Sequence, residues 1–252
     1  MEILLLRLDA PLMSFGAPVV DQYGVIQPYP ALSMLTGLLA NALGYRHTEA
    51  DRLQRLQDRL RYAVREDRRG QLLRDYQTVD LSQPFMRDDR AWTTRGVLER
   101  RRGGSASRGT HVRLRDYWAD AVYTVALTLE PPDESPTLAD LEQALRFPAR
   151  PLFIGRKPCV PAAPLLIGRA EATDLVGALQ AVPLDMRANR RRTYRVWWQT
   201  GPADACPEGV VETIRLPVSG KRDWANQIHT GSYWIAEGEI TVPTAEEEDH
   251  DR

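Results

Sequence analysis

The stretch AVYTVALTL, residues 121–129, decides the fold. Its side chains alternate between two sets, and Pro131 and Pro132 end the pattern. One set is Val122, Thr124, Ala126 and Thr128, and the other is Tyr123, Val125, Leu127 and Leu129. Alternation with a period of two, in a stretch rich in β-branched residues, predicts a β-strand. This strand is the clearest element of the chain.

Helices and strands are expected on both sides of this strand. The expected strands are residues 2–9, 62–65, 72–79, 165–170, 193–199, 210–216 and 232–236. The expected helices are about 33–43, 48–60 and 135–146, with a helical turn at 174–180. Thr48 is expected to cap the second helix, and the strands at 62–65 and 72–79 are expected to pair in a hairpin. The order βαββαβ up to residue 170 predicts an α+β fold of the ferredoxin-like (RRM-like) type.

The composition is that of an intracellular globular protein. The 252 residues are 43% hydrophobic and suffice for one large domain or two small ones. The two cysteines, Cys159 and Cys206, are too few for a disulfide framework, so a reducing cytoplasm is expected. The charged start does not predict a signal peptide, and no apolar run is long enough to span a membrane.

Positive charge is concentrated in residues 85–115. This stretch holds nine arginines and three acids, a balance of +6, whereas the whole chain carries a net charge of −1. It also contains Trp92 and several glycines. Arginine binds phosphate bidentately and stacks on bases, so a long Arg-rich excursion suits a nucleic-acid backbone with unpaired bases. The alternative is a solvated surface loop.

Three further segments carry candidate binding residues. On the strand at 73–79, Arg74, Tyr76 and Thr78 share one face, which suits a sheet that binds single-stranded RNA or places a tyrosine at its edge. Gly155 precedes Arg156 and Lys157, which favours either phosphate contact or a simple basic turn. A second basic cluster at 187–195 favours a surface loop, with RNA binding as the alternative.

The sequence offers little support for catalysis. It contains no HExxH, GxxxxGK[ST] or GxSxG motif, so no metal, cofactor or catalytic residue is expected. A metal-independent ribonuclease needs only one or two general acid or base groups, and His111 or Tyr76 leaves that alternative open. A third interpretation is an assembly protein whose basic loop meets an acidic partner.

Five segments, in order, resemble the CasD family of subunits of Cascade, the RNA-guided surveillance complex of type I-E CRISPR systems (RAMP superfamily). They are LRL (6–8) with MSFG (13–16), Pro30 and Ser33 leading into GLLANALG (37–44), LRDYQTV (73–79), RDY (115–117) leading into DAVYTVAL (120–127), and FIGRK (153–157) with Cys159. The likeness spans about residues 3–168.

The resemblance implies a ferredoxin-like palm with an inserted, Arg-rich β-hairpin or loop as a thumb. The expected domains are the palm at 1–84 and 116–240 with a C-terminal extension, the thumb at 85–115, and an acidic disordered tail at 241–252. It further implies a protein that grips the 5′ handle of the CRISPR RNA, caps the backbone subunits, and contacts the large subunit that inspects target DNA. A separate subunit cuts the precursor RNA in such systems, so this chain is expected to be non-catalytic.

The residues expected to bind RNA fall into a palm set and a thumb set. The palm set is Ser14, Phe15, Gly16, Ser33, Arg74, Tyr76, Gln77, Arg156 and Lys157. The thumb set is Trp92, Arg95, Arg100, Arg101, Arg102, Arg108, His111 and Arg113. The thumb arginines are expected to clamp phosphates, and Trp92 to stack on a base or pack the thumb root. Two departures are Ala31-Leu32, where relatives often carry a basic residue, and Phe15, where many carry Trp.

Overall fold

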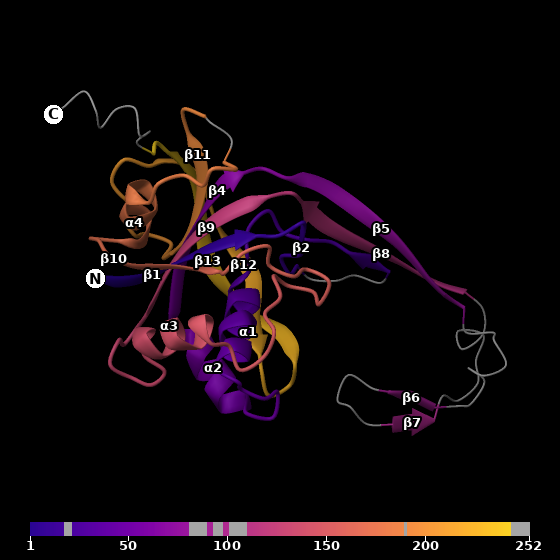
Figure 1. The fold of residues 1–252 in the computed structure, drawn as a ribbon. Coiled ribbons are helices and arrows are strands. Elements are labelled where there is room, and N and C mark those ends of the chain that lie inside the picture. The colour runs from indigo at the N-terminus through magenta and orange to yellow at the C-terminus, as the bar shows by residue number, and fades with distance from the viewer. Residues whose placement is uncertain (18–21, 81–89, 93–97, 101–109, 189–190, 243–252) are drawn as a thin grey trace.

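The structure is a computed structural model that describes residues 1–17, 22–80, 90–92, 98–100, 110–188 and 191–242. For residues 79–80, 90–92, 98–100 and 110–111 it describes the backbone only. A body of strands and helices carries a long two-stranded ribbon that projects from one side (Figure 1).

The body is a seven-stranded antiparallel sheet. Its strands, in spatial order, are β10 (Leu166–Glu171), β1 (Glu2–Asp9), β9 (Val122–Leu129), β4 (Leu60–Arg68), β11 (Tyr194–Thr200), β13 (Ile228–Ile240) and β12 (Val211–Asp223). Strand β9 lies at the centre of the first four and is buried along its whole length. The strand expected at 121–129 is therefore confirmed.

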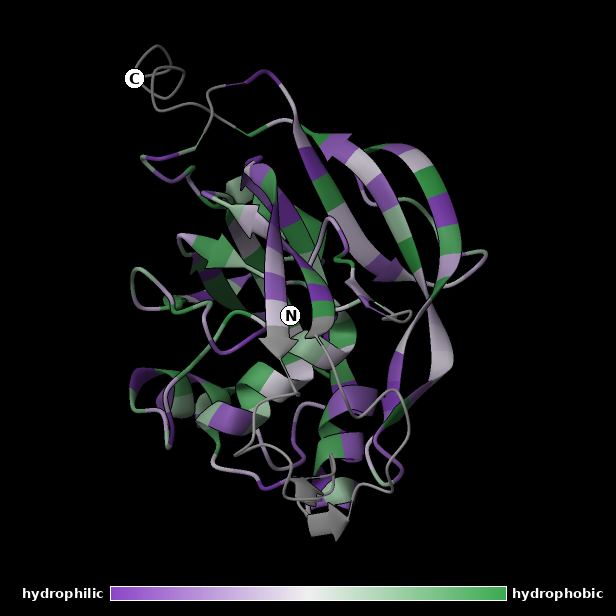
Figure 2. Ribbon diagram, turned by 90° about the vertical axis from the view of Figure 1, so that its right-hand side faces the viewer, coloured by the Kyte–Doolittle hydropathy of each residue, from purple (hydrophilic) through white to green (hydrophobic). Residues whose placement is uncertain are grey.

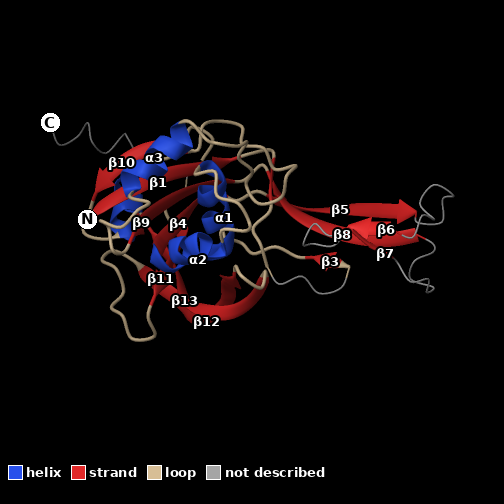
Figure 3. Ribbon diagram, turned by 90° about the horizontal axis from the view of Figure 1, so that it is seen from below, coloured by secondary structure: helices blue, strands red, loops and turns tan. Residues whose placement is uncertain are grey.

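Helices cover both faces of this sheet. The helices α1 (Leu32–Ala42), α2 (Ala50–Arg59) and α3 (Leu138–Arg146) pack on one face, over Leu4, Leu6 and Leu8 of β1. Helix α4 (Leu175–Ala181) packs on the other face, over Ile3 and Leu5. Figure 3 looks onto the side of the sheet that carries α1, α2 and α3. Because both faces are covered, the central strands are apolar on both sides. No helix among the described residues is long and apolar enough to cross a membrane.

Helices α2 and α3 both begin later than expected, and α3 starts at Leu138 instead of about residue 135. Thr137 caps α3 in a capping box with Asp140. The cap expected at Thr48 is wrong, because α2 begins at Ala50 and its N-cap is Glu49. The Glu49 carboxylate instead accepts a hydrogen bond from the backbone N–H of Arg46 at 2.7 Å, which closes the turn before the helix.

The ribbon continues the central hairpin of the sheet. Strand β4 runs into β5 (Gln71–Asp80), and β8 (Thr110–Ala119) runs into β9. The pairing of Arg68 with Val122 is followed by that of Gln71 with Ala119, so one antiparallel ladder passes from body to ribbon. The hairpin expected between 62–65 and 72–79 is wrong: both are strands, but they follow each other on one side of the ladder.

Short strands flank the ribbon. Strands β2 (Leu12–Met13) and β3 (Tyr23–Gly24) pair with the edge of β8 that β5 leaves open. Strands β6 (Arg90–Trp92) and β7 (Leu98–Arg100) pair with each other. From the side on which the ribbon projects, hydrophilic and hydrophobic residues alternate along the long strands (Figure 2).

Particular residues fix the conformation of the corner between body and ribbon. The corner comprises residues 66–71 and 119–122. The register shifts between Glu66 and Arg68, which marks a bulge. A Cβ at Gly70 would lie 2.2 Å from the carbonyl oxygen of Ala119, so only glycine fits there. Asp120 adopts a φ of 58°, a left-handed conformation that aspartate tolerates better than most residues.

The C-terminal strands are longer than expected. The segments expected at 210–216 and 232–236 are parts of β12 and β13, which have 13 residues each and pair with one another. Pro217, Gly220 and Gly231 interrupt the apolar alternation, so the sequence pattern shows only fragments of each strand. The strand expected at 193–199 is confirmed as β11.

Candidate nucleic-acid interface

A cationic cleft of about 600 Å³ lies beside α1. Its basic side chains come from four separate segments: Arg46, His47, Arg150, Lys157 and Arg222. The residues that line it include no aspartate or glutamate. Ser33, in the first turn of α1, and the half-buried ring of Phe153 also line it. A concave surface of this charge suits an anionic ligand that carries rings.

Arg150 holds the loop at one end of the cleft. Helix α1 ends before Gly44, whose φ of +81° lets the chain turn sharply toward Arg46 and His47. Arg150 donates hydrogen bonds to the carbonyl oxygens of Tyr45 and Gly44, both at 2.7 Å. Its guanidinium therefore satisfies carbonyls at the helix end and places charge at the cleft.

Arg222 is a cleft cation with unused hydrogen-bonding capacity. Its guanidinium lies 5.1 Å from the centre of the Trp224 ring, and its Nη2 donates to Gln227 at 2.6 Å. Its buried Nε finds no acceptor among the described residues. Burial lowers the pKa of this guanidinium, and no carboxylate contributes to that shift. A bound anion would supply both the missing acceptor and the missing charge.

Two loops predicted from the sequence meet under the cleft. The N–H of Ser14 donates to the carbonyl oxygen of Ile154 at 3.1 Å. A Cβ at Gly155, which has a φ of +96°, would lie 1.8 Å from the carbonyl oxygen of Ser14. Glycine is therefore required for the loops to approach. The Phe15 ring is fully buried and packs edge-on against Tyr123, with ring centres 5.0 Å apart, so it anchors the loop and offers no surface to a ligand.

Arg156 and Lys157 connect the cleft with the ribbon. Lys157 is exposed and lines the cleft. Arg156 donates to the carbonyl oxygens of Asp116 at 2.9 Å and Gly24 at 3.0 Å, and its guanidinium lies 5.0 Å from the centre of the Tyr117 ring. The loop after Gly155 thus joins the cleft to the base of β8.

The two faces of the ribbon differ in charge. Directly paired residues lie on the same face, so Arg74 and Tyr76 share a face with Asp116 and Leu114. The opposite face carries Asp75, Gln77, Arg113 and Arg115, together with Tyr117 and the Arg156 guanidinium above it, so its cations outnumber its one acid. The predicted palm set is therefore divided: Arg74 and Tyr76 lie on one face, and Arg156 lies over the other.

Arg74 is engaged within the ribbon. It donates to both oxygens of Asp116, at 2.7 and 3.0 Å. This bidentate hydrogen bond lowers the pKa of the Asp116 carboxyl and raises that of Arg74. Tyr76, in contrast, is 64% exposed. The expectation that Arg74, Tyr76 and Thr78 share one face agrees with the register of β5.

Half of the thumb set lies outside the described part of the chain. Arg95, Arg101, Arg102 and Arg108 are not described, and only the backbone is described for Trp92, Arg100 and His111. Among the other predicted residues, Ser33 and Lys157 meet at the cleft, Ser14 and Gly16 lie in the loop under it, and Arg113 lies on the cationic ribbon face.

The cleft also contains residues that sequence reasoning missed. The Arg46–His47 pair, Arg150 and Arg222 come from three distant parts of the sequence, and no local pattern marks them. The second basic cluster, in contrast, is largely compensated: Arg187 pairs with Asp9 and Asp120, and Arg195 with Glu237. The acids come from distant strands, which the local sequence does not reveal.

Comparisons with known proteins agree with this architecture. A sequence model of the family described as CRISPR-associated protein (Cas_Cas5) matches residues 3–235. The chain is 33% identical over 184 residues to the CRISPR system Cascade subunit CasD of Escherichia coli (strain K12), covering 70% of this chain and 75% of that protein.

Two solved structures share the fold over nearly the whole chain. One, described as a CRISPR RNA-guided surveillance complex, has a chain with a TM-score of 0.67 and 29% identity, covering 96% of this chain and 91% of that one. The other, a crystal structure of a Cas protein, has a TM-score of 0.63 and 25% identity, covering 96% and 98%. With the family match over most of its length, this chain belongs to the Cas5 family of CRISPR-associated proteins.

Proposed function

We propose that this chain is a non-catalytic RNA-binding subunit of a type I-E Cascade complex and grips the 5′ handle of the CRISPR RNA. The observation that carries the proposal is the acid-free cationic cleft, joined through Arg156 and Lys157 to the cationic face of the ribbon. The similarity to a Cascade subunit and to a chain of an RNA-guided surveillance complex supports it.

The architecture supports a palm and a thumb. Strands β10, β1, β9 and β4 are neighbours in that order, and α1 and α3 are the connecting helices, which is the arrangement of a ferredoxin-like palm. The ribbon leaves at Gln71 and returns at Ala119, so it forms the base of a thumb whose Arg-rich part is residues 85–115. On this proposal the palm with its C-terminal extension comprises residues 1–84 and 116–240, and residues 241–252 are an acidic tail.

The cleft holds the unpaired end of the handle. Arg46, Lys157 and Arg222 contact phosphates, and Phe153 offers its half-exposed ring to a base. The strand then passes along Arg113 and Arg115 toward the thumb arginines. Removing one charge-assisted hydrogen bond costs about 1.5–3 kcal/mol of binding free energy. On this proposal the chain caps the backbone subunits, contacts the large subunit, and leaves RNA cleavage to another protein.

The test is the salt dependence of handle binding by the purified complex. We expect Arg46→Ala combined with Lys157→Ala to weaken binding of a labelled handle RNA by at least about tenfold. The slope of log K against log salt should fall by about 0.7 for each phosphate that the variant no longer neutralises. Arg146→Ala is the matched control, because Arg146 is exposed on α3 and pairs with Glu142. Unchanged affinity and slope in the double variant would exclude the cleft from the RNA site.

The non-catalytic role has a separate test. Repeat RNA is incubated with the purified chain in EDTA. We expect no specific cleavage. Specific cleavage that is abolished in His111→Ala would contradict the proposal and identify an endoribonuclease.

A further inference from the structure

One wall of the cationic cleft carries two buried hydrogen-bond donors without acceptors. This wall is the hairpin tip, residues 222–228, which joins β12 to β13, and both Arg222 and Trp224 line the cleft. Six buried side-chain atoms of the described residues lack a hydrogen-bond partner, and Nε of Arg222 and Nε1 of Trp224 are two of them. They are neighbours, because the Arg222 guanidinium lies 5.1 Å from the centre of the Trp224 ring. An indole and a guanidinium can only donate, so the missing partner is an acceptor.

The polar groups around these two donors are paired. Gln57 of α2, which is 1% exposed, donates to the carbonyl oxygen of Arg222 at 2.9 Å and accepts its N–H at 3.1 Å. The Asp223 carboxylate accepts the N–H groups of Ala225 and Asn226 at 3.0 and 2.9 Å. The hairpin tip is therefore fixed to α2 and closed by its own turn. A loosely packed loop does not account for the two unpaired donors.

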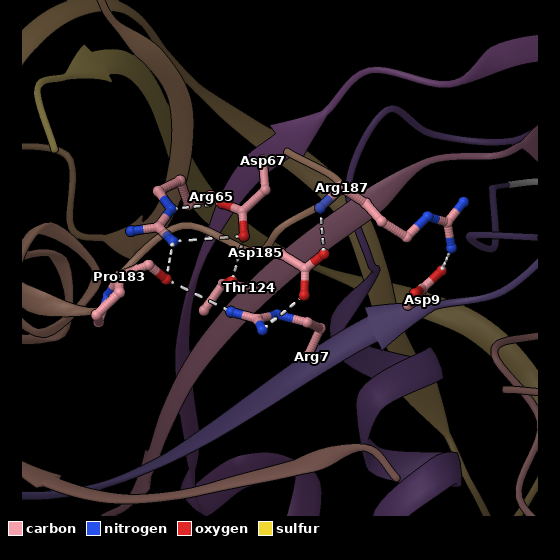
Figure 4. A network of polar contacts seen from close by, with 8 residues as sticks. All are labelled: Arg7, Asp9, Arg65, Asp67, Thr124, Pro183, Asp185 and Arg187. Atoms are coloured by element: carbon pink, nitrogen blue, oxygen red, sulfur yellow. Dashed lines mark hydrogen bonds and ion pairs between the residues drawn. The ribbon is translucent and has the colours of Figure 1, made fainter. Parts of the chain in front are cut away.

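Side chains of the same kinds find partners elsewhere in the molecule. The buried Trp197 donates its Nε1 to the Glu237 carboxylate at 2.8 Å. The buried Arg65 has a counter-ion, Asp67, beside it (Figure 4). For Arg222, the part of the chain that the structure describes supplies no such carboxylate, since burial alone shifts its pKa. The hairpin tip thus lacks both an acceptor and a negative charge.

We propose that Arg222 Nε and Trp224 Nε1 form a subsite for one phosphate group of the RNA, to whose oxygens both nitrogens donate. This proposal rests on the proposed function, because it names the group of the handle that the hairpin tip binds. A phosphate offers acceptors only, and its charge is the counter-ion that Arg222 lacks, whereas a base or a ribose offers oxygens without charge. Both nitrogens are covered by protein atoms, so the phosphate reaches them by displacing neighbouring side chains.

The indole N–H of Trp224 reports directly on this subsite. In the full-length chain, isotopically labelled at the indole nitrogens, the six tryptophans give six N–H resonances, and the one missing from Trp224→Phe belongs to Trp224. We expect this resonance to move downfield as inorganic phosphate is added, and to stay in place in sodium chloride of the same ionic strength. Trp234, half-buried on β13 and outside the cleft, is assigned through Trp234→Phe and should not move. A Trp224 resonance that responds to neither phosphate nor handle RNA would assign its N–H to ordered water and overturn the proposal.

Handle binding by the complex measures what the indole N–H contributes. Trp224→Phe keeps an aromatic ring and removes the donor, so it should weaken binding of a labelled handle RNA by about tenfold. The slope of log K against log salt should not change, because no charge is lost. Trp234→Phe is the matched control and should bind like the parent. Parental affinity in Trp224→Phe would contradict the proposal.

Arg222→Gln gives a second variant of the same subsite. It leaves the tryptophan in place, so it tests the subsite even if Trp224→Phe lowers the stability of the fold. It removes a charge as well as the donor, and should therefore both weaken handle binding and lower the salt slope by about 0.7. An unchanged slope would show that Arg222 neutralises no phosphate and would overturn the subsite.

Neutral linkages identify the acceptor. A handle RNA with a methylphosphonate in place of one phosphate at a time loses one charge and one oxygen at a known position. At the position that the subsite binds, Trp224→Phe should cause little further weakening, because the partner of the N–H is already gone. A full effect of Trp224→Phe at every position would make the acceptor a base or ribose oxygen, which the proposal excludes.

Failure of the subsite and failure of the proposed function give different results. If the complex binds handle RNA and Trp224→Phe binds it equally well, the proposed function stands and the subsite is wrong. If the complex binds no handle RNA, the proposed function fails, and the phosphate titration of the chain still decides the subsite. A resonance of Trp224 that moves with phosphate would then support it, and one that does not move would overturn it.

Discussion

The β4–β9 pair of the body and the β5–β8 pair of the ribbon form one continuous ladder, but they differ in how far their side chains are buried. In the body, β4 and β9 lie between helices on both faces, and every residue of β9 is buried. In the ribbon, β5 is exposed at most positions up to Thr78, including Leu72, Leu73 and Tyr76. Continuous backbone pairing therefore does not show which part of the molecule supplies the free energy of folding. The body supplies the free energy of folding, and the ribbon uses that support to present side chains.

The largest expected difference concerns the ion pairs of the two halves. Arg65 and Asp67 in the body are fully buried, whereas the Arg74 side chain of the ribbon pair is 52% exposed. Arg65→Ala leaves a buried carboxylate without its partner and is expected to cost about 3–5 kcal/mol of unfolding free energy. Arg74→Ala is expected to cost less than this, because the Arg74 side of the pair is open to water, although Asp116 itself is only 7% exposed. Urea denaturation measures both, and equal losses would contradict the comparison.

The corner is the next most sensitive position. Gly70→Ala would place a methyl group against the Ala119 carbonyl and force the strands apart, at an expected cost of about 1–3 kcal/mol. Gly16→Ala is the control, because no atom lies within 4 Å of its Cβ position, and it should stay within about 0.5 kcal/mol. If the two variants unfold at the same urea concentration, the corner is not tightly constrained.

Glu66 in the body and Asp116 in the ribbon should contribute to the unfolding free energy with opposite pH dependence. Burial raises the pKa of Glu66, so the folded state binds more protons than the unfolded state between the two pKa values, and stability falls as pH rises through that window. Glu66→Gln removes this loss, so its stability relative to the parent should increase from acid to neutral pH.

The contribution of Asp116 to the stability of the fold should increase, not decrease, as pH rises. The hydrogen bond from Arg74 lowers the pKa of Asp116, so its contribution is present above the unfolded pKa and is lost as pH falls through the folded one. Asp116→Asn should therefore be less stable than the parent near neutral pH, and the difference should shrink in acid. Unfolding free energies measured across pH test both signs, and slopes of the same sign would contradict the assignment.

The smallest expected effect is on the apolar surface of the ribbon. Leu72 is 57% exposed, and Leu72→Ala should change the unfolding free energy by less than about 0.5 kcal/mol. Leu127→Ala, at a fully buried position of β9, should cost about 2–5 kcal/mol. A comparable loss at Leu72 would show that the ribbon face packs against something in solution.

Local patterns predicted local structure well. The alternation at 121–129 and the helical patterns at 33–43 and 135–146 identified elements that the structure confirms. These features depend on neighbours within a few residues. The pairing of β5 with β8 was not predictable, because it joins residues about 30–50 positions apart along the chain.

The candidate site was predictable only in part, for the same reason. Ser33, Gly155 and Lys157 lie in segments with a recognisable pattern, and the structure brings them to one cleft or its floor. Arg46, Arg150 and Arg222 come from distant parts of the sequence and meet only after folding. The division of Arg74 and Arg156 between two ribbon faces also requires the register of β8, which no local pattern gives.

The continuity of the ladder across the corner has a consequence for biosynthesis. Residues 60–80 leave the ribosome well before residues 110–129, which complete their hydrogen bonds. Until then the nascent chain carries a long strand with open edges, the kind of segment that associates with other chains. Pairing is expected to start at the apolar β4–β9 end and to move outward past Gly70, so that the far end of the ribbon pairs last.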